Sequence, residues 1–450
     1  KAFQKLAKDP SDSVRQNLVV QKAGLFLSRS QSVYEGLKSY QSNINTKVSQ
    51  DIDKINKLGH KIHELNQQIS KIEAGGIETA MDLRDERDLA LDQLGALAKI
   101  SYKEDYKGVV TVKLEDEYFV DELHTYEIGK KTDKLTGFIT PYWPQLSDTD
   151  RDIYVNVFDF NVDISTALNS DVGELKALIM SRGDHWADYS DIEGKGEQEY
   201  LDTTNLSVII DMQAKLDQMV HNMITAINDQ LCPNVTGPVG VTYQDANGNT
   251  VNLSDAKVLD TENCARGSDG ELPPRELFVR AGIERYTEVT GSDGKTYYVY
   301  NEEDTSDTSY MYSLTSCGVN EELKKIETLF PHLKQNGEVD QQLGERLEAL
   351  WNKDLVGLDP TDPDECNIEE YYQKMIGGLA TVGNVYQKKA ENLAGSVLTI
   401  ENNRQQVIGV SSDEELQNMI KFQNAYNASS RFMTVISDMI EHIVTRLGNG

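Results

Sequence analysis

A long run of regularly spaced apolar residues occupies positions 44–76, which read INTKVSQDIDKINKLGHKIHELNQQISKIEAGG. Its apolar positions are three or four residues apart. They are Ile44, Val48, Ile52, Ile55, Leu58, Ile62, Leu65, Ile69 and Ile72. This spacing places the apolar side chains on one face of a helix and is typical of a coiled-coil seam. The tandem glycines Gly75 and Gly76 have poor helix propensity, so we expect the helix to end there in a turn.

A second helix is predicted after this turn, from about Thr79 to Ala98. Its sequence is rich in charged residues, and its leucines recur at helical spacing, so that they face the first helix. These leucines are Leu83, Leu91, Leu94 and Leu97. Residues 1–100 are therefore predicted to form a helical bundle arm.

The middle of the chain alternates between strand and helix patterns. Residues 101–171 contain short β-branched and aromatic runs, such as 109–114 and 153–158, and are predicted to be β-rich. Residues 172–231 are predicted to be helical, and an apolar stripe marks their second half. The stripe contains Ile209, Met212, Leu216, Met219, Met223, Ile227 and Leu231.

Residues 232–325 are dense in turn-forming residues and are predicted to form a β-rich, variable outer domain. A Gly-Ser-Asp-Gly-Lys turn at 291–295 precedes the run Thr296–Tyr300, which indicates a β-hairpin. Residues 326–412 are predicted to form a helical return arm that includes a polar connector at 359–365 and a helix from Ile368.

The last predicted helix, Asp413–Leu447, contains no glycine or proline and carries a second regular seam. The seam residues are Met419, Phe422, Tyr426, Ser429, Met433, Ile436, Ile440, Ile443 and Leu447. An isolated helix buries none of these side chains, so the seam requires a partner helix, either from the same domain or from a neighbouring molecule. We therefore predict a C-terminal coiled-coil helix at 413–450 with this seam as its assembly interface.

Together these patterns predict an α+β, multidomain fold. Both ends of the chain contribute to a long helical arm, and the β-rich domains are inserted in the middle.

Composition excludes several classes of partner. The chain has 74 acidic residues against 44 Lys and Arg, which gives a formal charge of −30 over 450 residues. So acidic a surface repels nucleic acid and anionic lipid, and we predict binding to neither.

The N-terminal residues lack the apolar core of a cleaved signal peptide. The four cysteines, Cys232, Cys264, Cys317 and Cys366, form no C-x-x-C motif. They are predicted to be buried thiols, and the sequence leaves open whether one disulfide forms among them.

No catalytic, cofactor-binding or metal-binding residues are predicted. His60 and His63 are three residues apart without the H-E-x-x-H spacing of zinc proteases. Asp184-His185-Trp186 follows Ser181, but no G-x-S-x-G elbow accompanies it. The acidic run 359–365 contains two prolines, which break the geometry of a calcium-binding loop.

Several motifs resemble those of the flagellar axial proteins, the family of rod, hook and hook-associated proteins. Residues 408–431, IGVSSDEELQNMIKFQNAYNASSR, are similar to the C-terminal segment of that family, as is VISDMI at 435–440. Three further stretches resemble the hook–filament junction members in particular. They are FQKLAKDPSD at 3–12 with Arg15, LNQQI at 65–69 with DLRDERDLALD at 82–92, and GELKALI at 173–179. The family's initial S-G-L-x-x-A helix is not found here, so we expect the chain to be a fragment that lacks this helix.

The resemblance implies a structural, non-enzymatic protein of the extracellular bacterial flagellum, without cofactors, that joins hook to filament. It implies export by the flagellar type III apparatus and self-assembly into a ring through terminal coiled coils. The implied partners are hook protein, hook-associated protein 3 and a cytoplasmic export chaperone. Alternatives are another axial protein, such as hook-associated protein 3 or a flagellin, an adhesin or toxin with a coiled-coil stalk, or an enzyme housed in the β-rich middle.

Overall fold

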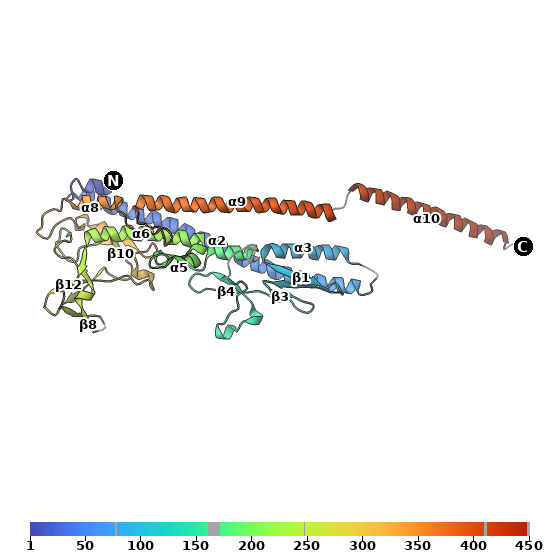
Figure 1. The fold of residues 1–450 in the computed structure, drawn as a ribbon, viewed down its shortest axis with the longest axis horizontal. Helices are drawn as coiled ribbons and strands as arrows, with labels where there is room; N and C mark the ends of the chain where they lie inside the picture. Colours follow the sequence, from blue (N-terminus) through green and yellow to red (C-terminus); the bar gives the residue numbers. More distant parts are fainter. Residues whose placement is uncertain (77–78, 161–171, 247, 409–411, 448–450) are drawn as a thin grey trace. The chain divides into compact units, whose positions relative to one another are not determined.

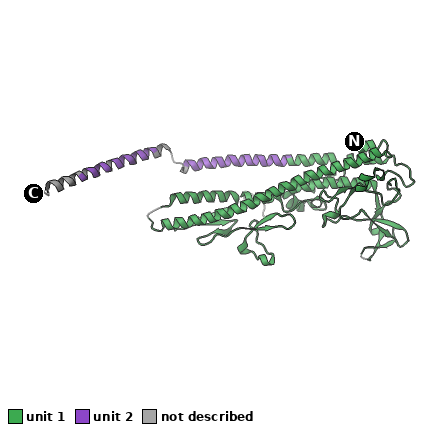
Figure 2. Ribbon diagram, turned by 180° about the vertical axis from the view of Figure 1, so that it is seen from behind, with its two compact units in different colours: residues 1–379 green, residues 380–450 purple. Residues whose placement is uncertain are grey.

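The computed structural model of the protein describes residues 1–76, 79–160, 172–246, 248–408 and 412–447 (Figure 1). The chain divides into two compact units, Lys1–Leu379 and Ala380–Gly450 (Figure 2). The boundary falls inside a long helix, so one continuous helix begins in the first unit and extends into the second. Residues 161–171, which end the predicted β-rich segment 101–171, and 409–411, which follow the predicted return helix, lie outside the described residues.

The α-helices are α1 Ala2–Leu6, α2 Ser13–Glu73, α3 Met81–Leu97, α4 Glu174–Arg182, α5 Glu197–Asp202, α6 Val208–Leu231, α7 Glu321–Lys325, α8 Leu343–Ala349, α9 Ile368–Ile408 and α10 Ser412–Leu447. Short 3-10 helices are η1 Pro144–Leu146, η2 Thr149–Arg151, η4 Tyr189–Asp191, η5 Thr204–Leu206, η6 Leu253–Asp255, η7 Thr308–Tyr310, η8 Glu327–Leu329 and η9 Leu350–Asn352. The strands are β1 Ile100–Glu104, β2 Val110–Leu114, β3 Glu117–Val120, β4 Gly129–Thr132, β5 Ile139–Tyr142, β6 Asn234–Thr236, β7 Thr242–Gln244, β8 Thr250–Asn252, β9 Lys257–Leu259, β10 Phe278–Val279, β11 Tyr286–Thr290, β12 Thr296–Tyr300 and β13 Gly318–Val319.

Helix α2 is the 61-residue axis of the first unit. It begins where the Asp12 carboxylate accepts a hydrogen bond from the Val14 N–H, and this cap satisfies one of the free amides of the first turn. The predicted seam is buried from Ile44 to Ile69, whereas Ile72, near the C-terminal end of α2, is 43% exposed. The sequence pattern therefore predicted this helix face correctly over all but its last turn.

Helix α3 packs against the C-terminal half of α2 and buries Leu91, Leu94 and Leu97 (Figure 1). Glu73, the last residue of α2, accepts hydrogen bonds from the Arg84 guanidinium at 2.6 and 2.7 Å and from the Ala80 N–H. Because charge-assisted, bidentate bonds are stronger than neutral ones, this ion pair holds the start of α3 against the end of α2.

Two large hydrophobic cores share α2. The first half of the helix contributes Val19, Val20, Ala23, Leu27 and Tyr34 to a core that also contains α6 and residues of the 259–375 region. The second half contributes Ile44 to Ile62 to a core with α3, the strands β1–β3 and α4. Residues of the predicted arm 1–100 therefore pack directly against the middle of the chain, and α2 connects the two cores without a break.

The sheets are small and antiparallel. The strand orders are β1-β2-β3, β4-β5, β7-β8, β10-β13 and β11-β12-β9-β6. The hairpin predicted around 291–300 is confirmed, with Tyr286 paired to Tyr300 and Thr290 to Thr296. The α+β class is confirmed as well.

The strand predicted at 153–158 is wrong. That segment makes only isolated bridges, from Ile153 to Asp148 and from Asn156 to Tyr142. The Val157 N–H donates to the Pro141 carbonyl, but Pro141 has no N–H with which to extend a ladder. The apolar residues Val157 and Phe158 are nevertheless buried, because they reach the core from an irregular segment.

Helix α6 is buried on its apolar stripe as predicted, with Met212 only half-buried. Buried polar side chains of α6 form hydrogen bonds to the backbone of loops that are distant in the sequence. Asp217 accepts hydrogen bonds from the Tyr189 N–H at 3.0 Å and the Leu314 N–H at 2.6 Å. Asn228 donates to the Phe278 carbonyl at 2.8 Å and accepts from the Leu277 N–H at 3.1 Å. Through these hydrogen bonds, α6 positions the loops around residues 189, 277 and 314, and the last two belong to the predicted β-rich domain 232–325.

The long helix of the predicted return arm 326–412 begins at Ile368, where the sequence pattern places it, and the residues before it form η8, α8, η9 and irregular segments. The predicted polar connector 359–365 is not fully solvated, because Asp359 is buried and pairs with the Lys215 ammonium at 2.9 Å. This ion pair connects the segment before α9 to α6.

Candidate assembly surface

The first turns of α9 are anchored in the first unit. Ile368, Tyr371 and Met375 are buried, and the Tyr371 hydroxyl donates to the Gln218 side chain of α6 at 2.8 Å. Farther along the helix the apolar side chains become exposed. They are Ile376, Leu379, Val382, Val385, Tyr386, Leu393, Val397, Leu398 and Ile400. The helix thus changes from a packed element to one with a free apolar face.

Helix α10 presents most of the predicted seam to solvent. The exposed fractions are 60% for Met419, 70% for Phe422, 75% for Tyr426 and 69% for Met433, and Ser429 is exposed too. Ile436, Ile440, Ile443 and Leu447 continue the same spacing on α10, and their side chains lie outside the described ones. Large apolar side chains at such spacing are typical of a surface that becomes buried against another helix.

Sequence reasoning missed part of this surface. Leu416, Ile420 and Phe432 are also exposed, at 51%, 50% and 65%. Leu416 extends the seam by one turn and Phe432 flanks it, whereas Ile420 lies two residues, or about 200°, from Phe422 and therefore on the other side of the helix. A search for one narrow seam excludes flanking residues, whereas a count of all apolar residues within a wider arc of the helix would have found them. The apolar face of α10 is therefore broader than a two-position coiled-coil seam.

The other candidate clusters are satisfied by local partners. The His60 imidazole contacts the Glu127 carboxylate at 2.6 Å, and His63 contacts the Asp121 carbonyl at 3.2 Å. In the described part of the chain, no group of three His, Cys, Asp or Glu side chains is arranged to hold a metal ion. Likewise, none of the described helices has both the length and the hydropathy to cross a membrane.

His185 belongs to an ion-pair cluster. Its Nδ1 lies 2.6 Å from the Asp184 carboxylate, and its Nε2 lies 3.2 Å from Asp191. These two carboxylates raise the pKa of His185 to about 10. The His185 carbonyl in turn accepts a hydrogen bond from the Gln41 amide of α2 at 3.1 Å. The cluster therefore holds the 184–191 segment in place.

We expect this ion-pair cluster to make stability depend on pH. The folded pKa of His185, about 10, lies above the unfolded value of about 6.5. Its contribution is therefore complete below pH 6.5 and is lost as the pH rises through 10. Urea unfolding of the wild type should show a decrease in stability over this range, relative to His185→Gln. Equal pH profiles of the wild type and His185→Gln over this range would contradict the prediction.

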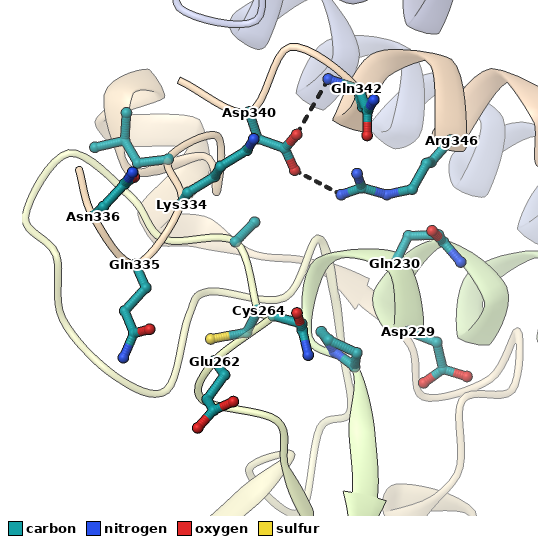
Figure 3. A pocket seen from close by; sticks show the side chains of 14 residues that line it. Asp229, Gln230, Glu262, Cys264, Lys334, Gln335, Asn336, Asp340, Gln342 and Arg346 are labelled. Atoms are coloured by element: carbon teal, nitrogen blue, oxygen red, sulfur yellow. Dashed lines mark hydrogen bonds and ion pairs between the residues drawn. The ribbon is translucent and has the colours of Figure 1, made fainter. Parts of the chain in front are cut away.

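A cavity of about 610 Å³ opens between the end of α6, the 262–265 loop and α8 (Figure 3). Its wall includes the Asp340–Arg346 ion pair, with 2.7 Å between the carboxylate and the guanidinium, and the side chain of Cys264. The four cysteines are all free and buried. The cavity is predominantly polar, and the sequence pattern gave no sign of it because its residues come from separate segments.

Comparison with known proteins agrees with the motifs of the two chain ends. Residues 1–250 match the family model of the flagellar hook-associated protein FlgK helical domain. Residues 405–446 match the C-terminal model of the flagellar basal body rod FlgEFG proteins. This second match covers most of α10, including its exposed seam residues.

Individual relatives share the chain over nearly its full length. Flagellar hook-associated protein 1 of Bacillus subtilis (strain 168) is 22% identical, over 100% of this chain and 75% of that protein. The protein of the same name from Salmonella typhimurium (strain LT2) is 18% identical, over 98% of this chain and 79% of the relative. In fold, the chain is similar to the flagellar hook junction protein FlgK from Burkholderia pseudomallei, with a TM-score of 0.50, 13% identity and coverage of 91% and 92% of the two chains. Because the model of the FlgK helical domain covers more than half of its 450 residues, the protein belongs to the FlgK family of flagellar hook-associated proteins.

Proposed function

We propose that this protein is a structural part of the bacterial flagellum that joins the hook to the filament and assembles through the apolar face of α10. Membership of a flagellar hook-associated family places the protein in the flagellum, outside the cell. The single observation that carries the assembly mechanism is the exposure of Met419, Phe422, Tyr426 and Met433 within the segment that matches the axial-protein C-terminal model.

The energetic argument rests on apolar burial. Covering a large apolar side chain is worth about 1.5 to 3 kcal/mol, so four such residues could contribute about 6 to 12 kcal/mol before ordering costs are subtracted. A long helix with no packing partner gains none of this. Neighbouring copies that align their α10 helices would bury the seams against one another, and repetition of the contact would close a ring.

The six predicted parts receive roles in this proposal. The helical parts 1–100, 172–231 and 326–412 support subunit contacts, the β-rich parts 101–171 and 232–325 face outward, and 413–450 forms the coiled-coil core. Hook protein and hook-associated protein 3 are the proposed neighbours, and a cytoplasmic chaperone covers the seam before export through the flagellar type III apparatus. Nothing in this role requires catalysis.

Removal of residues 413–450 from the full-length protein tests the function. We expect cells with this deletion to assemble hooks without attached filaments and to lose swimming motility. Electron microscopy of the cell surface and a motility assay give the readouts. Protein recovered in the medium verifies that export still occurs. Filaments of normal number and attachment, at normal protein levels, would contradict the proposal.

A further inference from the structure

The first half of α2 has a second apolar face besides the one that it buries in the core. Val14, Leu25, Val33 and Tyr40 are all exposed. At 3.6 residues per turn they lie within an arc of about 100° of the helix. The side chains that this half of α2 contributes to the core lie on the other side. Exposed apolar residues gathered on one face of a helix indicate a surface that another helix can cover.

This second face is basic, although the whole chain is acidic. Lys22 and Arg29 lie in the same arc as the exposed apolar residues, and both are exposed. Residues 13–43 contain one acidic residue, Glu35, which lies outside the arc and pairs with Lys38. Among the described residues, neither Lys22 nor Arg29 has an ion-pair partner. A basic, apolar face on a chain of charge −30 fits an acidic, apolar partner, which a second copy of the chain can supply.

Helix α3 carries a face of this complementary kind. Its two arginines are both engaged with the rest of the first unit, since Arg84 pairs with Glu73 and the buried Arg87 donates to the Gly108 carbonyl. They therefore leave the outward carboxylates of α3 without neutralisation. The exposed residues of the outward arc are Met81, Asp85, Asp88, Leu89 and Asp92.

The two faces match in their spacing. Each contains a row of three residues at intervals of four, in the order apolar, charged, apolar. The rows are Leu25, Arg29 and Val33 in α2 and Met81, Asp85 and Leu89 in α3. If the helices pack antiparallel with Arg29 opposite Asp85, the apolar ends of the rows meet, and Lys22 lies opposite Asp92. In a parallel pair Lys22 would lie beyond the start of α3, so the antiparallel arrangement satisfies more charges.

The two faces of a single molecule cannot meet. Helix α3 packs against the half of α2 that begins near Ile44 (Figure 1). At 1.5 Å per residue, Lys22 lies about 33 Å before Ile44 along the same helix. A contact between the faces therefore joins two copies. Because it uses a different surface on each copy, every copy can contact two neighbours, and repetition gives a ring or an open chain.

We propose that the acidic outward face of α3 in one copy docks on the basic apolar face of α2 in a second copy, with Asp85 against Arg29. This contact rests on the self-assembly proposed above but uses no residue of α10. The arginine–carboxylate pair fixes the register, and the apolar residues on either side of it contribute affinity through burial. Because salt screens exposed ion pairs, the contact should weaken as the ionic strength rises.

Sedimentation velocity of the full chain tests this contact in a Phe422→Glu background, where the α10 seam no longer supports association. We expect self-association that depends on protein concentration and weakens with added salt. Arg29→Glu and Asp85→Arg should each weaken it about tenfold or more, because each places like charges opposite one another. The two substitutions together should restore association, which repair of a folding defect would not explain. The control is Lys54→Glu, an equal charge change at an exposed position in the other half of α2, and it should have no effect.

A carbodiimide crosslink identifies the partner face, because the reagent joins an amine directly to a carboxylate. We expect a peptide pair that joins Lys22 to Asp92, with one peptide from each copy when isotope-labelled and unlabelled chains are mixed. A monomer at every protein concentration would overturn the proposal, and so would equal weakening by Lys54→Glu, no recovery in the double variant, or crosslinks from Lys22 to acidic residues outside α3. None of these outcomes depends on filament attachment, so this contact and the proposed role of α10 can fail separately.

Discussion

Cells that carry Phe422→Glu in the full-length protein are expected to lose attached filaments almost completely. Phe422 is 70% exposed in the middle of the α10 face, where the proposed assembly would bury it. The substitution removes about 1.5 to 3 kcal/mol of apolar burial at each contact and adds a carboxylate with no partner, which costs more. At about 1.4 kcal/mol for each tenfold change in affinity, the loss exceeds one to two orders of magnitude per contact.

The matched control for this prediction lies two residues along the same helix. Asn424 is exposed as well, and at 3.6 residues per turn it lies about 200° around the helix from Phe422. Asn424→Glu adds the same charge to the same helix outside the seam, so we expect attached filaments and normal motility. Equal loss of filaments in both variants would indicate a general effect of charge on α10 and would contradict a specific role for the seam.

The second large effect concerns stability. Asp217→Ala should lower the free energy of unfolding of the first unit by about 2 to 6 kcal/mol. The Asp217 side chain is buried, and its two oxygens separately accept the Tyr189 and Leu314 N–H groups. Alanine leaves both donors buried without acceptors, and each costs about 1 to 3 kcal/mol. Because the donors lie in the loops around residues 189 and 314, both loops should become more mobile in this variant.

Urea or thermal unfolding of the purified chain measures this effect. Asp217→Asn keeps one carbonyl acceptor and should lose roughly half as much, since its amide group cannot accept from the second N–H. The exposed Asp85 of α3 gives the surface control, and Asp85→Ala should change stability by less than about 0.5 kcal/mol. A loss for Asp217→Ala no larger than that of the control would show that α6 does not hold these loops as proposed.

Periodicity predicted the elements whose burial is decided locally. The α2 seam and the α6 stripe repeat every three or four residues because one face of each helix meets a core, and the 291–295 turn defines its hairpin by its own residues. The fold class, the axial-protein resemblance and the position of the last helix followed from such signals. The α10 seam was also predicted from the spacing of its apolar residues, and its role as an assembly interface stays a prediction.

The sequence pattern did not predict contacts between distant residues. Asp217 and Leu314 are 97 positions apart, and Lys215 pairs with Asp359, so no local period reveals that these polar groups are buried together. The failed strand at 153–158 has the same origin, because its partner segment contains Pro141, and only the pairing shows the missing donor. The cavity at Cys264 likewise depends on three separate segments.

Helix α2 has a mechanical consequence. Its 61 residues, at a rise of about 1.5 Å each, form a rod of about 90 Å that enters both large cores. Force applied at one core reaches the other along an unbroken ladder of backbone hydrogen bonds, with no loop in which it could be dissipated. In a protein that connects the hook to the filament, such a helix would transmit force stiffly from one core to the other. The two cores would be the places where force enters and leaves the helix.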